Sequence, residues 1–95
     1  MNYNETVDKV MVLLKEKGVC FSSQQSHRDC YESLRLFMEQ RNEGYSDAIR
    51  ESWLAYIKNE LHRQRCAVWL QYAYQLEEMD STGIISDRRL YLNRS

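Results

Sequence analysis

Apolar residues recur along this chain at the spacing of an α-helix in four successive stretches. Residues three and four apart share one face of a helix, so each stretch predicts a helix. The predicted helices cover about 5–17, the residues after Ser22 up to Asn42, 47 to a bend within 59–65, and about 65–80. The apolar stripes of the first three are Val7, Val10, Met11 and Leu14; Cys30, Tyr31, Leu34, Phe37 and Met38; and Ile49, Trp53, Tyr56, Ile57 and Leu61.

Small polar residues and glycines mark where these helices should begin and end. Asn4 and Ser46 are the expected N-caps, and Ser22 with Gln25 has the spacing of a capping box. Glycine adopts the left-handed conformation that ends many helices without steric cost. The predicted helix ends are therefore followed by the three glycines of the chain, Gly18, Gly44 and Gly83.

The fourth stretch differs because it is apolar on nearly every side from Cys66 to Leu76, with Gln71 and Gln75 as interruptions. Such a helix is either buried against several neighbours or presents a second face to a partner. No glycine or proline separates it from the third helix. One continuous helix over 47–80 is therefore the alternative to a bend, although that length would be unusual in so small a domain.

These patterns predict an all-α fold, a four-helix bundle with a short C-terminal extension. The chain has 95 residues, the length of one domain, and its 43% apolar content suffices for one modest core. Proline is absent, which also favours helices. We place the domain at 1–86, and 87–95 as a basic tail or linker containing Arg88, Arg89 and Arg94.

Charge and cysteine content narrow the function classes. The net charge is −1, so a DNA-binding surface would have to be a local basic patch rather than a global excess. Three cysteines without a CxxC pair indicate reduced thiols in a cytoplasmic protein rather than a disulfide framework. The N-terminus shows no secretory signal, and no apolar run is long enough for a membrane span.

Catalytic and metal-binding patterns are weak. His27 with Cys30 and His62 with Cys66 have spacings that could each hold part of a zinc site, but a buried cysteine in a helical core is the more common reason for such a pattern. No motif surrounds any serine or cysteine as a nucleophile, and there is no glycine-rich phosphate loop. The chain is therefore predicted to be no enzyme by itself, and we expect no cofactor and no metal.

Two polar clusters are candidates for contact with DNA. The first surrounds the junction of the third and fourth helices, where Glu60 is the one acidic residue among several basic ones. The second lies at the start of the second helix, where a helix N-terminus and hydroxyl or amide side chains can bind phosphate. Together they give the predicted DNA contacts Ser23, Gln24, Arg28, Lys58, His62, Arg63 and Arg65.

The order of these features resembles the N-terminal core-binding domain of tyrosine recombinases and phage-type integrases. The resemblance covers about Val7 to Ile85. It consists of a cap at Ser22-Ser23 with an apolar face from His27 to Phe37, then Tyr45-Ser46 through Leu54, and an ending at 76–79 and 82–85. His27 stands where the family usually has an aromatic residue.

The resemblance implies a SAM-like orthogonal bundle that clamps duplex DNA beside a separate, C-terminal catalytic domain of a site-specific recombinase. That domain would hold the catalytic residues, so none is assigned here. The predicted partners are double-stranded DNA and that catalytic domain, without a membrane. The alternative is a small protein-interaction module that uses the apolar helix 66–76 as its interface.

Overall fold

The computed structural model describes residues 1–61 and 66–90, and within these ranges the regular structure is entirely helical. Four substantial helices follow one another, α1 (Tyr3–Glu16), α2 (Phe21–Arg41), α3 (Asp47–Asn59) and α4 (Cys66–Thr82), and a short helix, α5 (Asp87–Leu90), follows them. The predicted all-α bundle is confirmed. The third and fourth helices are separate, as predicted, since α3 ends at Asn59.

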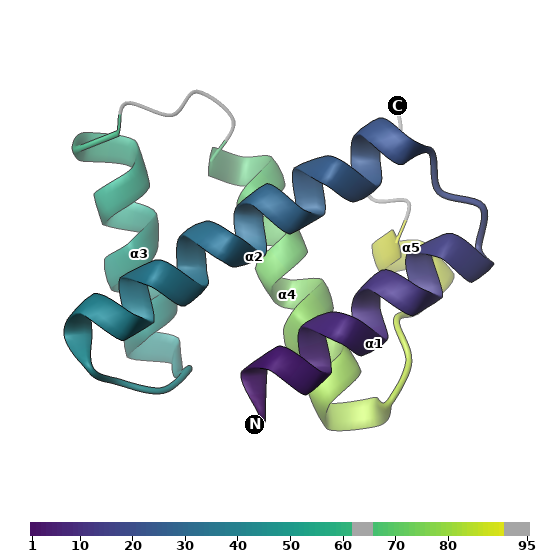
Figure 1. The fold of residues 1–95 in the computed structure, drawn as a ribbon, viewed down its shortest axis with the longest axis horizontal. Coiled ribbons are helices and arrows are strands. Elements are labelled where there is room, and N and C mark those ends of the chain that lie inside the picture. The colour runs from purple at the N-terminus through teal and green to yellow at the C-terminus, as the bar shows by residue number, and fades with distance from the viewer. Residues whose placement is uncertain (62–65, 91–95) are drawn as a thin grey trace.

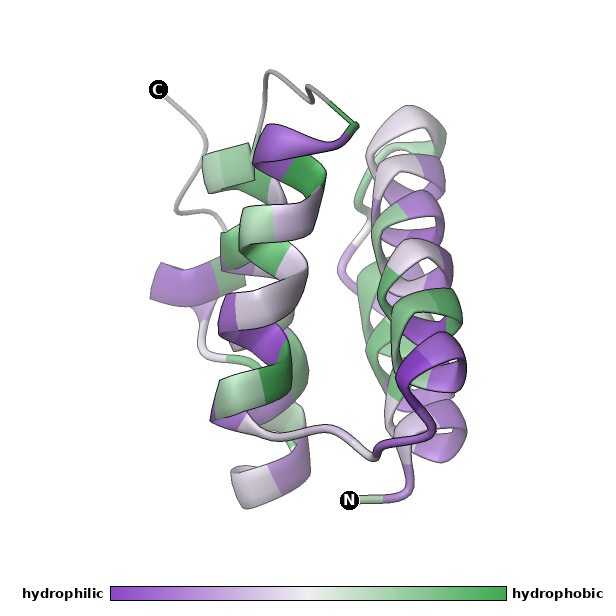
Figure 2. Ribbon diagram, turned by 90° about the vertical axis from the view of Figure 1, so that its left-hand side faces the viewer, coloured by the Kyte–Doolittle hydropathy of each residue, from purple (hydrophilic) through white to green (hydrophobic). Residues whose placement is uncertain are grey.

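The helices form two layers. Figure 1 shows α1 and α2 side by side in front, running in opposite directions and crossing over α4. Figure 2, turned by 90°, shows this pair as one layer and α3 with α4 as the other. Helix α4 lies at the centre, because it contacts each of the other four helices.

The core lies between the two layers. Trp53 of α3 is fully buried, and its indole ring stacks on that of Trp69 of α4 with ring centroids 5.9 Å apart. The Trp53 Nε1–H donates to the hydroxyl of Ser33 of α2 over 3.1 Å, so one side chain joins three helices. The Tyr31 hydroxyl donates to the carbonyl of Tyr72 over 2.7 Å and joins α2 to α4.

The central position of α4 accounts for its apolar sequence. Trp69, Tyr72, Ala73, Leu76 and Met79 are all buried. Among the described residues, the large apolar side chains that remain exposed lie outside α4, at Met1, Val12, Phe21, Leu36, Leu61 and Ile84. Of the two explanations for a helix that is apolar on nearly every side, burial against several neighbours is therefore the observed one.

The predicted helix starts are partly wrong. The N-cap of α1 is Asn2 rather than Asn4, and its side chain accepts from the backbone N–H of Glu5. The predicted capping box at Ser22 does not form, because α2 begins at Phe21, two residues before the predicted start, and Ser22 already lies in its first turn. The Gln25 side chain instead donates to Asp29. Ser46 is confirmed as the N-cap of α3.

Two of the three glycine assignments are confirmed. Gly18 and Gly83 have positive φ angles of 72° and 80°, the conformation that favours glycine past a helix end. Gly44 does not have this role. Asn42 takes the left-handed conformation at the end of α2 with φ of 53°, which asparagine tolerates better than most residues.

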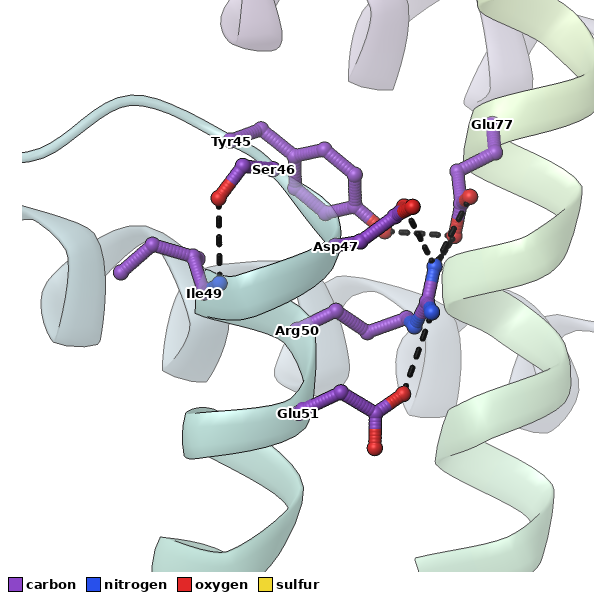
Figure 3. A network of polar contacts seen from close by, with 7 residues as sticks. All are labelled: Tyr45, Ser46, Asp47, Ile49, Arg50, Glu51 and Glu77. Carbon is purple, nitrogen blue, oxygen red and sulfur yellow. Dashed lines mark hydrogen bonds and ion pairs between the residues drawn. The ribbon is translucent and has the colours of Figure 1, made fainter.

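A polar network fixes the start of α3 against the end of α4 (Figure 3). The Arg50 guanidinium is largely buried and donates to both carboxylate oxygens of Glu77, at 2.9 and 2.8 Å. The Tyr45 hydroxyl donates to the same carboxylate over 2.7 Å. Asp47 and Glu51 bind the guanidinium from its own helix. The α2–α3 turn is thereby held on the C-terminal half of α4.

Candidate nucleic-acid interface

The first two turns of α2 carry three of the predicted DNA contacts, and two of these have internal roles. The Gln24 side-chain amide donates to the Val19 carbonyl over 2.8 Å, so it stabilises the turn between α1 and α2. The Ser23 backbone carbonyl lies 2.7 Å from Nδ1 of His27. Ser23 and Gln24 are both half-buried, which leaves each only part of its surface for a ligand.

Arg28 is exposed on the side of α2 that faces α1. It lines a groove of about 820 Å³ between these two helices, together with Lys15, Gln25 and Asp29 among other residues. The acidic neighbours Asp29 and Glu32 are also on this side, so the groove is of mixed charge. Within the first half of α2, Arg28 is the only lysine or arginine.

No side-chain cap closes the first turn of α2, in contrast to α1 and α3. The residue before the helix is Cys20, whose thiol lies 3.4 Å from the Ser22 hydroxyl. The first N–H groups of a helix have no intrahelical partner and carry the positive end of the helix dipole. This turn also exposes Phe21, whose side chain is 78% accessible. It is thus an open, electropositive end of a helix.

The junction cluster is only partly placed. Lys58 is exposed in the last turn of α3, while His62, Arg63 and Arg65 lie outside the described residues. Figure 1 shows that the end of α3, the start of α4 and the start of α2 all lie at its upper edge. The structure therefore brings the start of α2 and the last turn of α3, which carries Lys58, to one edge. Arg28 lies further along α2 and faces α1.

Acidic side chains gather at the opposite edge. Seven of the fourteen acidic residues lie in the last turns of α2, the α2–α3 turn, the first turns of α3 and the last turns of α4: Glu39, Glu43, Asp47, Glu51, Glu77, Glu78 and Asp80. The contacts of Arg50 and Tyr45 with Glu77 hold these segments together. Figure 1 places them along its lower edge. The same segments carry two cations, Arg41 and Arg50, so this edge is acidic on balance.

Sequence reasoning missed a buried polar cluster beneath the first turn of α2. His27 is only 3% exposed, and its ring stacks on Tyr72 of α4 with centroids 3.6 Å apart. Its Nε2 lies 2.8 Å from Oε1 of Gln75, which is 1% exposed. Burial lowers the pKa of His27, against the opposing effect of its contacts with Ser23 and Gln75. The sequence held two signals for this cluster, His27 on the apolar face of its helix and a glutamine within the most apolar stretch.

The described residues contain no group of three or more potential metal ligands. Both ring nitrogens of His27 already face oxygen atoms, and the Cys30 thiol donates to the Trp69 carbonyl over 3.6 Å. Within 1–61 and 66–90, no helix is both long enough and apolar enough to cross a membrane.

Comparison of the chain with models of protein families, with curated proteins and with solved structures found no match.

Proposed function

We propose that this chain is a DNA-binding domain of a site-specific recombinase, which clamps duplex DNA beside a catalytic domain on another part of the protein. In this proposal the domain contributes affinity and position, acts in the cytoplasm and performs no chemistry by itself. The proposal starts from the sequence resemblance to core-binding domains of tyrosine recombinases.

The observation that carries it is the distribution of helix ends and charges. The uncapped start of α2 and the start of α4 lie at one edge, together with the last turn of α3. Half of the acidic residues lie at the other edge. Helix N-termini, hydroxyl groups and cations are the groups that contact the phosphate backbone of DNA. We define the upper edge as residues 21–28, 58–61 and 66–70.

In the sequence, further basic residues follow α3. Between Tyr56 and Leu76 there are three basic residues and one acidic residue, Glu60. We propose that Arg63 and Arg65, which follow α3 in the chain, contribute phosphate contacts beside Lys58. The alternative, an interaction module built on 66–76, receives less support because α4 is covered by the other helices.

A DNA-binding titration tests the proposal. Fluorescence anisotropy of a labelled duplex is measured with the wild-type chain at low and moderate salt, where phosphate contacts predict binding that weakens steeply as salt rises. The double variant Arg63→Ala/Arg65→Ala should lower the logarithmic salt slope by about 2 if each arginine neutralises one phosphate. The matched control is Arg41→Ala, a single cation at the opposite end of α2.

The outcomes separate the proposal from its alternative. Binding that fades with salt and drops in the double variant, but not in the control, supports the proposal. Absence of binding at low salt overturns DNA contact by this chain. Equal losses in Arg41→Ala and in the double variant would show a non-specific charge effect, and would also overturn the assignment of the upper edge.

A further inference from the structure

The buried contacts of His27 contain a mismatch between donors and acceptors that only one protonation state resolves. Four groups in a row join α2, α4 and α5: the Ser23 carbonyl, the His27 ring, the Gln75 side chain and the Arg89 carbonyl. The separations are 2.7 Å from Nδ1 to Ser23, 2.8 Å from Nε2 to Gln75 Oε1, and 3.3 Å from Gln75 Nε2 to Arg89.

Both ends of this row are backbone carbonyls, which only accept hydrogen bonds. The contact with Ser23 therefore requires a hydrogen on Nδ1. The amide oxygen of Gln75 also only accepts, so the contact with Nε2 requires a second hydrogen on the ring. The observed arrangement is thus satisfied throughout when the ring is an imidazolium, and the Gln75 amide then donates to Arg89.

A neutral ring cannot satisfy the same row. With its hydrogen on Nδ1, Nε2 becomes an acceptor and faces the Gln75 oxygen. Turning the amide over lets its NH₂ group donate to Nε2, but the amide oxygen then faces the Arg89 carbonyl, where two acceptors meet. With its hydrogen on Nε2 instead, the ring would keep Gln75 and Arg89, but Nδ1 would then face the Ser23 carbonyl at 2.7 Å, acceptor against acceptor. A buried polar group left without its partner is costly. The short contact with Ser23 favours the hydrogen on Nδ1, and this neutral form gives up the bond to α5.

We propose that His27 and Gln75 form a proton-controlled latch, which ties the Arg89 carbonyl of α5 to α4 when the ring is protonated and releases it when the ring is neutral. The proton comes from solvent and returns to it, and no covalent bond changes. The latch is internal to the chain, so it holds whether or not the domain binds DNA.

The surroundings of His27 determine when the latch closes. The Tyr72 ring of α4 stacks on the His27 ring, and the centroid of the Tyr31 ring of α2 lies 6.1 Å from that of His27. Among the described residues, no charged side chain contributes to its pKa, which burial lowers and the contacts with Ser23 and Gln75 raise. The Arg89 guanidinium points elsewhere, toward Glu78 and the Tyr74 ring. The latch is consequently open near neutral pH and closes on acidification.

Other tethers of α5 use carboxylates instead of the histidine. Glu78 accepts from the Arg89 side chain and from the Ser86 backbone N–H, each over 2.9 Å, and Lys17 lies 3.4 Å from Asp87. These contacts do not involve His27 or Gln75. Opening the latch should therefore loosen α5 rather than detach it.

Nuclear magnetic resonance of the full 95-residue chain tests the latch. The ring ¹⁵N shifts of His27 report its protonation and tautomer, the side-chain amide of Gln75 reports its orientation, and the Arg89 carbonyl with the Leu90 amide reports α5. The spectra are recorded across the histidine titration. We expect a neutral ring with its hydrogen on Nδ1, and one common midpoint for all three reporters. Exchange protection of the Leu90 amide should rise about fivefold on closure, the ratio expected for one hydrogen bond.

A variant pair controls the measurement. Gln75→Met fills similar volume without the amide, so the Arg89 and Leu90 signals should stop following His27, whereas Gln71→Met on the same helix should leave the coupling intact. A titration of His27 that leaves the Arg89 signal unmoved in the wild type would overturn the latch, as would a neutral ring with its hydrogen on Nε2. The wild-type titration decides the question even if Gln75→Met does not fold.

Discussion

Replacing Trp53 by alanine should have a large effect on stability, because this side chain joins three helices. It is fully buried, stacks on Trp69 and donates to Ser33. The hydrogen bond contributes about 1 kcal/mol and the aromatic pair about 0.5–1.5 kcal/mol beyond its buried area. With the cavity left behind, the expected loss in the free energy of unfolding is about 3–5 kcal/mol.

That loss is large relative to the total stability of the domain. A domain of this length has a free energy of unfolding of about 5–14 kcal/mol. Urea denaturation followed by far-UV circular dichroism measures the change without depending on tryptophan fluorescence. With a slope of about 1–1.5 kcal/mol per molar urea, the midpoint should fall by about 2 M or more.

Two controls make the result interpretable. Ser33→Ala removes only the acceptor of the indole and should cost about 1 kcal/mol. Phe21→Ala removes an aromatic ring of which 78% is exposed, and should cost no more than about 0.5 kcal/mol. A loss for Trp53→Ala below about 1.5 kcal/mol, or one equal to that of Phe21→Ala, would refute the placement of Trp53 at the centre of the core.

Three further perturbations test other parts of the structure. Burial lowers the pKa of His27 in the folded chain, so the unfolded chain binds this proton more readily. The free energy of unfolding should therefore fall as pH drops below the ordinary histidine range. Urea midpoints at about pH 7.5 and 5 measure this fall, and His27→Phe should remove the part of the pH dependence that comes from this histidine. Glu77→Gln weakens the contact with Arg50 and should cost about 1–2 kcal/mol, since the 30% exposed Glu77 side chain is partly solvated; a loss no larger than that of the exposed control Glu43→Gln would contradict it. Tyr31→Phe removes the hydroxyl bond to α4 and should cost about 1 kcal/mol by thermal or urea unfolding, whereas no measurable loss would argue against that bond.

The fold class followed from periodicity alone, because helical spacing of apolar residues reports which face is buried. The stripes containing Val10, Leu34 and Trp53 are core in the structure. Helix starts were less predictable because a cap depends on local backbone geometry. Ser22 has the side chain of a cap, yet α2 begins before it. Asn42 takes the left-handed conformation at the end of α2, whereas the prediction gave this role to Gly44, two residues later.

The candidate site was predictable only in part. The sequence predicted Arg28 and Lys58 as DNA contacts, and both are exposed. It could not show that the side-chain amide of Gln24 donates a hydrogen bond to the Val19 carbonyl. Nor could it pair His27 with Gln75, because 48 residues separate them and only the crossing of α2 over α4 brings them together. Long-range polar pairs of this kind leave no periodic pattern in a sequence.

The central claim is that duplex DNA binds at the upper edge, where α2 and α4 begin. Its most direct test is a map of backbone amide shifts on addition of a short duplex at low salt. We expect shifts concentrated in 21–28 and 66–70, and their loss as salt rises. Shifts concentrated instead in 39–47 and 77–80, or none at all at low salt, would contradict it.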